Sequence, residues 1–249
     1  MTRVVASDDP MIDVARLDEA LEAAVVAAET RDEDELVAAA SGATGLVVDV
    51  NTPVTARVLD ELDALEVVAR AGVGVDNVDV KAAAENGVTV TNVPDYCTDE
   101  VATHTVALLF DCIRNVTGYD RDVKAGHWGW ERSRPLHRVA GRTLGLVSYG
   151  PIARRVRDRL RGFDLDVVAY DPYVDAETMA DDGVEKVALA ALYARADYAS
   201  LHAPLTDGTR GMVDADALAA MQDHAVLVNT GRGGLVDEDA LVSALERRD

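Results

Sequence analysis

The sequence predicts an α/β protein whose parallel sheets are covered by helices. Short runs rich in β-branched residues alternate with segments rich in Ala, Asp and Glu that are typical of helices. The alternation stops after Pro94 and resumes at Thr143. This interruption predicts two domains, which we place at residues 1–98 and 99–249.

Each expected element follows from a local pattern. In the first domain the strand-like runs are "RVVAS" (3–7), "GLVVDV" (45–50), "EVVAR" (66–70) and "VTVTN" (88–92), separated by helix-like stretches such as "LDEALEAA" and "DEDELVAAA". Residues 98–124 then read as one long helix, with Asp99 and Glu100 in its first turn and Gly126 after its end. We expect "HWGWERSRPLHRVAGR" to be a connector.

Alternation resumes with "TLGLV" (143–147), "DVVAYDP" (166–172), "DYASLHAP" (197–204) and "AVLVNTGRG" (225–233), and the chain ends inside the helix-like "DEDALVSALERRD". No apolar run approaches the ~20 residues of a membrane span, and the N-terminus lacks the pattern of a secretory leader. We therefore expect a cytoplasmic protein.

The net charge of −21 argues against nucleic acid and anionic membranes as partners, because a phosphate backbone would be repelled. Only three of the 24 basic residues are lysines. This acidic, lysine-poor composition favours a halophilic setting, where a Debye length of ~3 Å at 1 M salt screens self-repulsion. Cys97 and Cys112 are the only cysteines, and no motif indicates a metal site.

The stretch "TLGLVSYGPIARRV" has the layout of a dinucleotide-binding turn between a strand and a helix. Gly150 stands at the middle position, where the backbone must approach a pyrophosphate, and Ala153 at the third, where a small residue lets helix and strand pack. Ser148 occupies the first position, usually glycine. If it must adopt a positive φ, a strain of about 1–3 kcal/mol is expected.

A second feature supports a nucleotide site. Asp171 ends the strand "VVAY", 21 residues after Gly150, where a carboxylate can bind both ribose hydroxyls and repel a 2′-phosphate. NAD, rather than NADP, is therefore the expected cofactor. A solvated strand end is the alternative interpretation of Asp171.

Several segments together resemble the D-isomer-specific 2-hydroxyacid dehydrogenases. They are "VVARAGVGVDNVDV" (67–80), "TVTNVPDYCTDEVATHTVALL" (89–109), "TLGLVSYGPIARRV" (143–156), "VVAYDPY" (167–173), "LHAPLTDGTRGMV" (201–213) and "LVNTGRGGLVDEDAL" (227–241). The "PDYCTDEV" wording is similar to the branch of the C-terminal-binding-protein corepressors, with phosphoglycerate dehydrogenase as a near neighbour. The resemblance implies two flavodoxin- and Rossmann-like parallel-sheet domains, the second doubly wound and NAD-binding.

The resemblance also implies hydride transfer between NAD(H) and C2 of a small 2-hydroxy or 2-keto acid. It assigns the substrate carboxylate to Arg70 and to the backbone of Gly72, Val73 and Gly74, although a plain turn of small residues would also explain these glycines. Arg232 matches the catalytic arginine, whose planar fork can hold a carboxylate and polarise a keto oxygen.

The implied cofactor-binding residues lie in several loops. A buried helix threonine would explain one of them, Thr105, equally well. The full set is Val73, Thr105, Tyr149, Gly150, Pro151, Ile152, Asp171, His202, Ala203, Pro204, Thr209, Thr230, Gly231 and Arg232.

The family's acid–base chemistry needs a histidine and a carboxylate that follow the arginine motif by several tens of residues. Neither motif occurs before Asp249, and none of the five histidines matches the position. We therefore expect a C-terminally truncated dehydrogenase that forms a homodimer like its relatives and binds NAD with little turnover. A non-enzymatic NAD(H)-responsive interaction module is the alternative.

Overall fold

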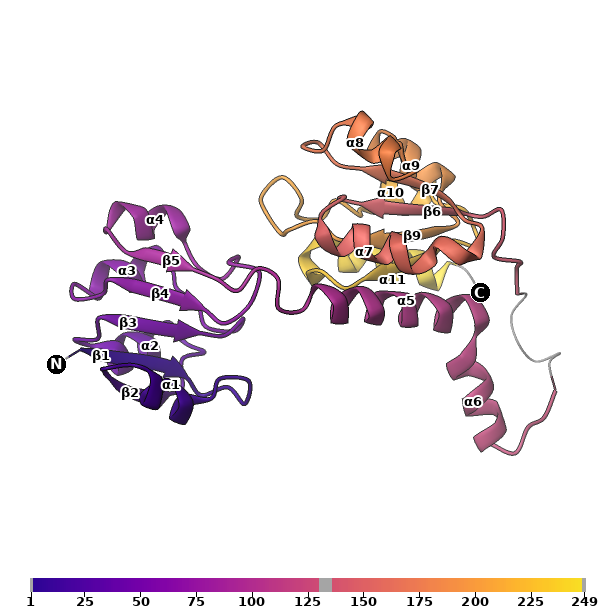
Figure 1. Ribbon diagram of the computed structural model, residues 1–249. Helices are drawn as coiled ribbons and strands as arrows, with labels where there is room; N and C mark the ends of the chain where they lie inside the picture. The colour runs from indigo at the N-terminus through magenta and orange to yellow at the C-terminus, as the bar shows by residue number, and fades with distance from the viewer. Residues whose placement is uncertain (1, 130–135, 248–249) are drawn as a thin grey trace. The chain divides into compact units, whose positions relative to one another are not determined.

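The computed structural model describes residues 2–129 and 136–247. The chain divides into two compact units, Met1–Tyr96 and Cys97–Asp249, called unit 1 and unit 2 below. Each unit contains one five-stranded sheet whose strands all pair in parallel (Figure 1). The predicted α/β class with two parallel sheets is confirmed. In the part of the chain that is described, no helix has the length and apolarity needed to cross a membrane.

Unit 1 has the strand order β2-β1-β3-β4-β5, which is the flavodoxin-like order. Its strands are β1 (Arg3–Ser7), β2 (Ala24–Ala28), β3 (Gly45–Val48), β4 (Val67–Arg70) and β5 (Thr89–Thr91). Its helices are α1 (Val14–Ala20), α2 (Glu33–Ala40), α3 (Ala56–Glu61) and α4 (Val80–Glu85).

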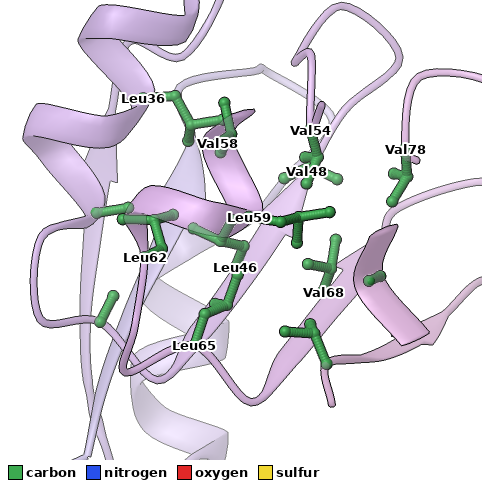
Figure 2. Close-up of a cluster of buried hydrophobic side chains, with 14 of the residues drawn as sticks. Leu36, Leu46, Val48, Val54, Val58, Leu59, Leu62, Leu65, Val68 and Val78 are labelled. Carbon is green, nitrogen blue, oxygen red and sulfur yellow. The ribbon is translucent and has the colours of Figure 1, made fainter. Parts of the chain in front are cut away.

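A single apolar cluster forms the core of unit 1. Figure 2 shows Leu36 of α2 and Leu59 of α3 packed with Leu46 of β3 and Val68 of β4. Each of these side chains is at most 2% exposed. Burial of apolar side chains is the main favourable contribution to folding, and in unit 1 it holds the sheet against helices α2 to α4.

The sequence reading missed β2. Its residues "AVVAA" follow an alanine-rich segment without alternation, and they lie at the sheet edge where no residue of the strand is buried. An edge strand with one paired side carries a weak hydrophobic signal, and its pairing with β1 decides its conformation.

Unit 2 has the strand order β10-β9-β6-β7-β8, the doubly wound order of Rossmann folds. Its strands are β6 (Thr143–Val147), β7 (Asp166–Tyr170), β8 (Glu185–Lys186), β9 (Tyr198–Leu201) and β10 (Val226–Asn229). Its helices are α5 (Thr98–Arg114), α6 (Val116–Lys124), α7 (Pro151–Leu160), α8 (Ala176–Asp181), α9 (Leu189–Arg195), α10 (Ala215–Ala220) and α11 (Glu238–Glu246), with short 3₁₀ turns η2 (Arg161–Phe163) and η3 (Gly233–Leu235).

Two apolar clusters cover the two faces of this sheet. One joins α5, α7 and α8 through Leu109, Val156 and Met179. The other joins α9 and α10 through Leu192 and Ala217. Helices on both faces leave only the strand ends open to ligands, which is the usual place for a site in such folds.

The predicted single helix over 98–124 is wrong, because Asn115 breaks it with a left-handed backbone (φ 54°). The carboxylate of Asp111 accepts the N–H and the hydroxyl of Thr117 at 2.7 and 2.8 Å, which caps the new helix α6. Gly118 leaves room for the Asn115 side chain, since a Cβ there would lie 2.4 Å from Asn115 Oδ1. Residues 130–135 of the expected connector lie outside the described residues.

Aspartates begin most of the helices. Their carboxylates accept backbone N–H groups of the first turn, which would otherwise lack partners. The capping residues are Asp13, Asp32, Asp79, Asp175, Asp214 and Asp237, with Thr55 in the same role. Helices α5, α6, α7 and α9 have no side-chain cap from their N-cap residues, and α7 begins at Gly150.

Gly145, in the middle of β6, allows helix α9 to pack closely. A Cβ there would lie 2.7 Å from Leu192 Cδ2 and 2.9 Å from Ala196 Cβ. We expect Gly145→Ala to lower the free energy of unfolding by about 1–3 kcal/mol through overpacking, as measured by urea unfolding. Gly162→Ala is the matched control, because a Cβ at Gly162 meets nothing within 4 Å. Equal unfolding curves for the two variants would contradict the packing argument.

Candidate nucleotide-binding site

The predicted cofactor residues of unit 2 lie at the carboxyl ends of its strands. The strand order reverses between β6 and β9, which are adjacent in the sheet but separated in sequence by β7 and β8. Loops on either side of such a reversal diverge and leave a crevice for a ligand. The turn at Gly150 follows β6 and the segment from His202 follows β9, so both border this reversal.

The turn after β6 presents free backbone to this edge. Gly150 is the N-cap of α7 and Pro151 is its first residue, a position at which the missing N–H of proline costs nothing. A Cβ built on Gly150 meets no protein atom within 4 Å. The uncapped N-terminus of a ten-residue helix, with open space beside its glycine, suits the two phosphates of a dinucleotide. Ile152 follows in the same turn of helix.

Ser148, at the first position of the turn, has a φ of 72°, the condition under which the sequence predicts strain. A residue with a Cβ is held there at a cost of about 1–3 kcal/mol. Its hydroxyl donates to Asp171 Oδ2 at 3.1 Å, and the N–H of Tyr149 donates to the same oxygen at 2.8 Å. These bonds oppose the strain.

Asp171 is only 5% exposed, so the alternative interpretation of this residue as a solvated strand end is wrong. Its other oxygen, Oδ1, accepts the N–H groups of Tyr173 and Val174 at 2.8 and 3.2 Å. Burial raises the pKa of the carboxyl, but the four hydrogen bonds to the anion outweigh burial and hold the pKa below its usual value. Asp171 is therefore ionised at neutral pH. Its predicted contact with the ribose would compete with the hydroxyl of Ser148.

Tyr149 does not face a ligand with its side chain. The ring is wholly buried and its hydroxyl donates to Asp182 Oδ2 at 2.9 Å, while its carbonyl accepts from Arg154 Nε at 3.2 Å. The expectation that Tyr149 binds the cofactor is thus corrected for the side chain, which anchors the turn from inside.

The loop after β9 holds four of the predicted residues. His202 Nε2 lies 2.9 Å from Ser200 Oγ, and burial lowers the pKa of His202 to about 4. Ala203 is buried and Pro204 is exposed. The hydroxyl of Thr209 donates to the Pro204 carbonyl at 2.6 Å and accepts the N–H of Thr206 at 2.8 Å. Thr209 therefore fixes the shape of the loop.

Thr105 and Thr230 meet although they are 125 residues apart in the sequence. Their hydroxyls are 2.8 Å apart, and the Thr105 hydroxyl also lies 2.8 Å from the carbonyl of Val101. Thr105 is wholly buried, so the alternative interpretation as a buried helix threonine describes it. It contacts the loop after β10 through Thr230.

The loop after β10 carries Arg232. The side chain of Asn229 accepts the N–H of Gly231 at 3.0 Å and donates to the Arg232 carbonyl at 2.9 Å. These two bonds fix the backbone of the loop at the carboxyl end of β10. The Arg232 guanidinium lies within reach of the Gly231 carbonyl, with Nη1 at 3.3 Å.

The predicted substrate residues lie in unit 1, after β4. The N–H of Gly72 donates to the Arg70 carbonyl at 2.8 Å, so it is not a donor for a carboxylate, and that part of the prediction is corrected. The space of a Gly72 side chain is filled by the Arg70 guanidinium, whose Nη1 would lie 1.5 Å from a Cβ. Among the described residues, Arg70 Nε is buried without a hydrogen-bond partner. Val73, 36% exposed, and Gly74 complete the turn.

Sequence reasoning missed the residues that hold these loops in place. Arg154 and Asp182 anchor Tyr149, and Asn229 braces the loop of Arg232. Asn229 could have been found, because it directly precedes the motif "TGRGG" at a strand end. Nothing in the sequence pairs Asp182 with Tyr149, since 33 residues separate them.

The shifted pKa of His202 predicts how stability changes with pH. A histidine that stays neutral in the fold but binds a proton near pH 6.5 when unfolded stabilises the protein above that pH, and this contribution is lost as the pH falls toward 4. We expect wild type to lose up to about 3 kcal/mol more unfolding free energy than His202→Gln between pH 7 and pH 4, measured by urea unfolding. Parallel pH profiles for the two proteins would contradict this expectation.

Comparison with known proteins gives a consistent result. The chain is 37% identical over 248 residues to D-3-phosphoglycerate dehydrogenase of Methanocaldococcus jannaschii, covering 99% of this chain and 47% of the relative. It is 37% identical to hydroxypyruvate reductase of Thermotoga maritima, covering 87% of this chain and 69% of that protein. The chain thus spans about half the length of the phosphoglycerate dehydrogenase and two thirds of the reductase.

A solved structure is also similar. D-lactate dehydrogenase from Aquifex aeolicus, complexed with NAD and lactic acid, superimposes with a TM-score of 0.87 at 28% identity, covering 98% of this chain and 73% of the other. The family model of the D-isomer specific 2-hydroxyacid dehydrogenase NAD-binding domain matches residues 106–249. This chain therefore belongs to the D-isomer specific 2-hydroxyacid dehydrogenase family, and its unit 2 carries the family's NAD-binding domain.

Proposed function

We propose that the protein is an NAD-dependent oxidoreductase that acts on a small 2-hydroxy or 2-keto acid. The observation that carries the proposal is the turn at Gly150, where an uncapped helix N-terminus and open space coincide with a fingerprint of nucleotide binding. The phosphoglycerate dehydrogenase and hydroxypyruvate reductase relatives support the substrate class.

The residues of unit 2 fit NAD. Gly150, Pro151 and Ile152 would receive the pyrophosphate, and the ionised Asp171 would accept a ribose hydroxyl and repel a 2′-phosphate. His202 is neutral at pH 7, so it would contact the cofactor without adding charge. When bound, the cofactor supplies the hydride-transfer chemistry.

On the substrate side we assign Arg232 to the keto oxygen and carboxylate, because its guanidinium donates in a planar fork and stays charged. Thr230 and Gly231 support this arginine through the loop contacts described above. Arg70, Val73 and Gly74 are assigned to carboxylate binding in unit 1. An acid–base group for the substrate proton is not assigned to any residue of this chain.

Two further assignments accompany the proposal, and one alternative function stands beside it. The absence of a membrane-spanning helix from the described residues fits the cytoplasm as the compartment. Helix α6 has no buried residue and exposes Val116 and Val123 at 57% and 51%, which suits a homodimer contact. The corepressor-like branch would instead make the chain an NAD(H)-responsive interaction module.

The pyrophosphate position is tested by Gly150→Val. The backbone at Gly150 has a negative φ of −78°, so a side chain is accepted, but its methyl groups would fill the space assigned to the phosphates. We expect NADH binding, followed by fluorescence titration, to weaken by at least about tenfold, while the free energy of unfolding changes by less than about 1 kcal/mol. Tight NADH binding by the variant would place the phosphates elsewhere.

Activity separates the two candidate functions. Wild-type protein is assayed with NADH and glyoxylate, hydroxypyruvate or pyruvate, next to Arg232→Lys, which keeps the charge but loses the fork. Turnover that the substitution lowers supports the dehydrogenase. NADH binding without turnover, together with partner binding that depends on NADH but not on Arg232, supports the interaction module.

The acidic composition predicts that salt stabilises the fold. A net charge of −21 on 249 residues repels itself in dilute buffer, and 1 M salt shortens the Debye length to ~3 Å. We expect the melting temperature, followed by circular dichroism, to rise steadily from dilute buffer to 2 M KCl. A melting temperature that is unchanged by KCl would reject the halophilic assignment.

A further inference from the structure

The serine at position 148 introduces backbone strain into the turn after β6. Its φ of 72° is a conformation that glycine adopts freely and that residues with a Cβ adopt only when the surroundings enforce it. Yet the position of Gly150, and with it the phosphate-binding backbone, depends on that conformation. Something nearby must hold the turn in place.

Every polar group of the next residue, Tyr149, makes a hydrogen bond. Its N–H donates to Asp171 Oδ2 at 2.8 Å, its carbonyl accepts from Arg154 Nε at 3.2 Å, and its hydroxyl donates to Asp182 Oδ2 at 2.9 Å. The ring is wholly buried. Because both peptide groups of Tyr149 are fixed, the backbone of Ser148 cannot relax toward negative φ without breaking these bonds.

Arg154 and Asp182 complete a closed arrangement around this tyrosine. Arg154, in the first turn of α7, also donates from Nη1 to Asp182 Oδ2 at 2.9 Å, and its guanidinium lies 4.6 Å from the centre of the Tyr149 ring. Asp182 is the C-cap residue of α8, which belongs to the next strand–helix unit. The arrangement thus links the turn, helix α7 and the end of helix α8. We call Tyr149, Arg154 and Asp182 the Tyr149 brace.

We propose that the Tyr149 brace compensates for the serine at position 148 and keeps the turn in the shape that binds the pyrophosphate. Its three members are positioning residues for NAD(H), although none of their side chains is assigned to the cofactor. The inference rests on the proposed function and adds a dependence specific to this chain: the brace matters because residue 148 has a side chain. With glycine at 148, the turn would keep its shape without it.

The test is a double-mutant comparison read out by NADH fluorescence titration. Tyr149→Phe keeps the buried ring and removes only the hydroxyl, and we expect it to raise the dissociation constant for NADH about fivefold, the effect of one hydrogen bond. In the Ser148→Gly background the same change should alter the dissociation constant less than about twofold. In the Ser148→Ala background, which keeps a Cβ and loses the hydroxyl, it should again cost about fivefold.

Tyr198→Phe is the matched control. Tyr198 is 3% exposed in the same apolar cluster, and its hydroxyl has no partner among the described residues, so this change should leave NADH binding within about twofold of wild type. Asp182→Asn provides a second way to weaken the brace, at a side chain that is 32% exposed and therefore less critical for folding. Its effect should also disappear with glycine at 148.

Three results would overturn the proposal: no effect of Tyr149→Phe on NADH binding, an equal effect in all three backgrounds, or an equal effect of Tyr198→Phe. Amide hydrogen exchange of Tyr149, Gly150, Ile152 and Ala153 without NADH gives an independent readout, because a weakened brace should speed exchange there only when residue 148 has a Cβ. If wild type fails to bind NADH, the proposed function is wrong, but the exchange pattern still decides whether the brace holds the turn.

Discussion

The candidate site depends on the hydrogen bonds that the carboxylate of Asp171 accepts. Asp171 ends β7, and its two oxygens accept hydrogen bonds from the turn after β6 on one side and from the start of its own loop on the other. Neighbouring parallel strands deliver their loops to the same edge of the sheet, and a buried anion with four donors holds those loops together. The strained Ser148, the uncapped helix and the predicted ribose contact all lie within reach of this one group.

The acidic composition has a structural use as well as a surface effect. Six exposed aspartates cap helices, so their carboxylates accept the backbone N–H groups of the first turns at the surface of the fold. Helix α7, which starts at Gly150, carries four arginines. These arginines pair with Asp99, Asp158 and Asp182. Each of the four arginines of α7 therefore has a carboxylate partner.

Much of the fold could be predicted from the sequence, because central strands such as "TLGLV" are buried on both faces and carry continuous apolar runs. Elements with weak burial were missed: β2 and the two-residue β8 lie at sheet edges and depend on pairing with a neighbour. The break at Asn115 was missed because it depends on a capping bond from Asp111 across the break. In the site, the motif identified Ser148 as the position where a positive φ would strain the chain, and the structure has that φ. The burial of Thr105 and the anchoring of Tyr149 by Asp182 depend on tertiary contacts that no local pattern encodes.

The turn after β4 shows how one position can constrain another. The guanidinium of Arg70 occupies the volume that any side chain at Gly72 would need, and it is 6% exposed. Replacing the glycine would expel a buried cation, whereas shortening the arginine would leave an empty space beside bare backbone. Along evolutionary lineages these two positions should therefore change together or not at all, and a substitution seen at one predicts a compensating residue at the other.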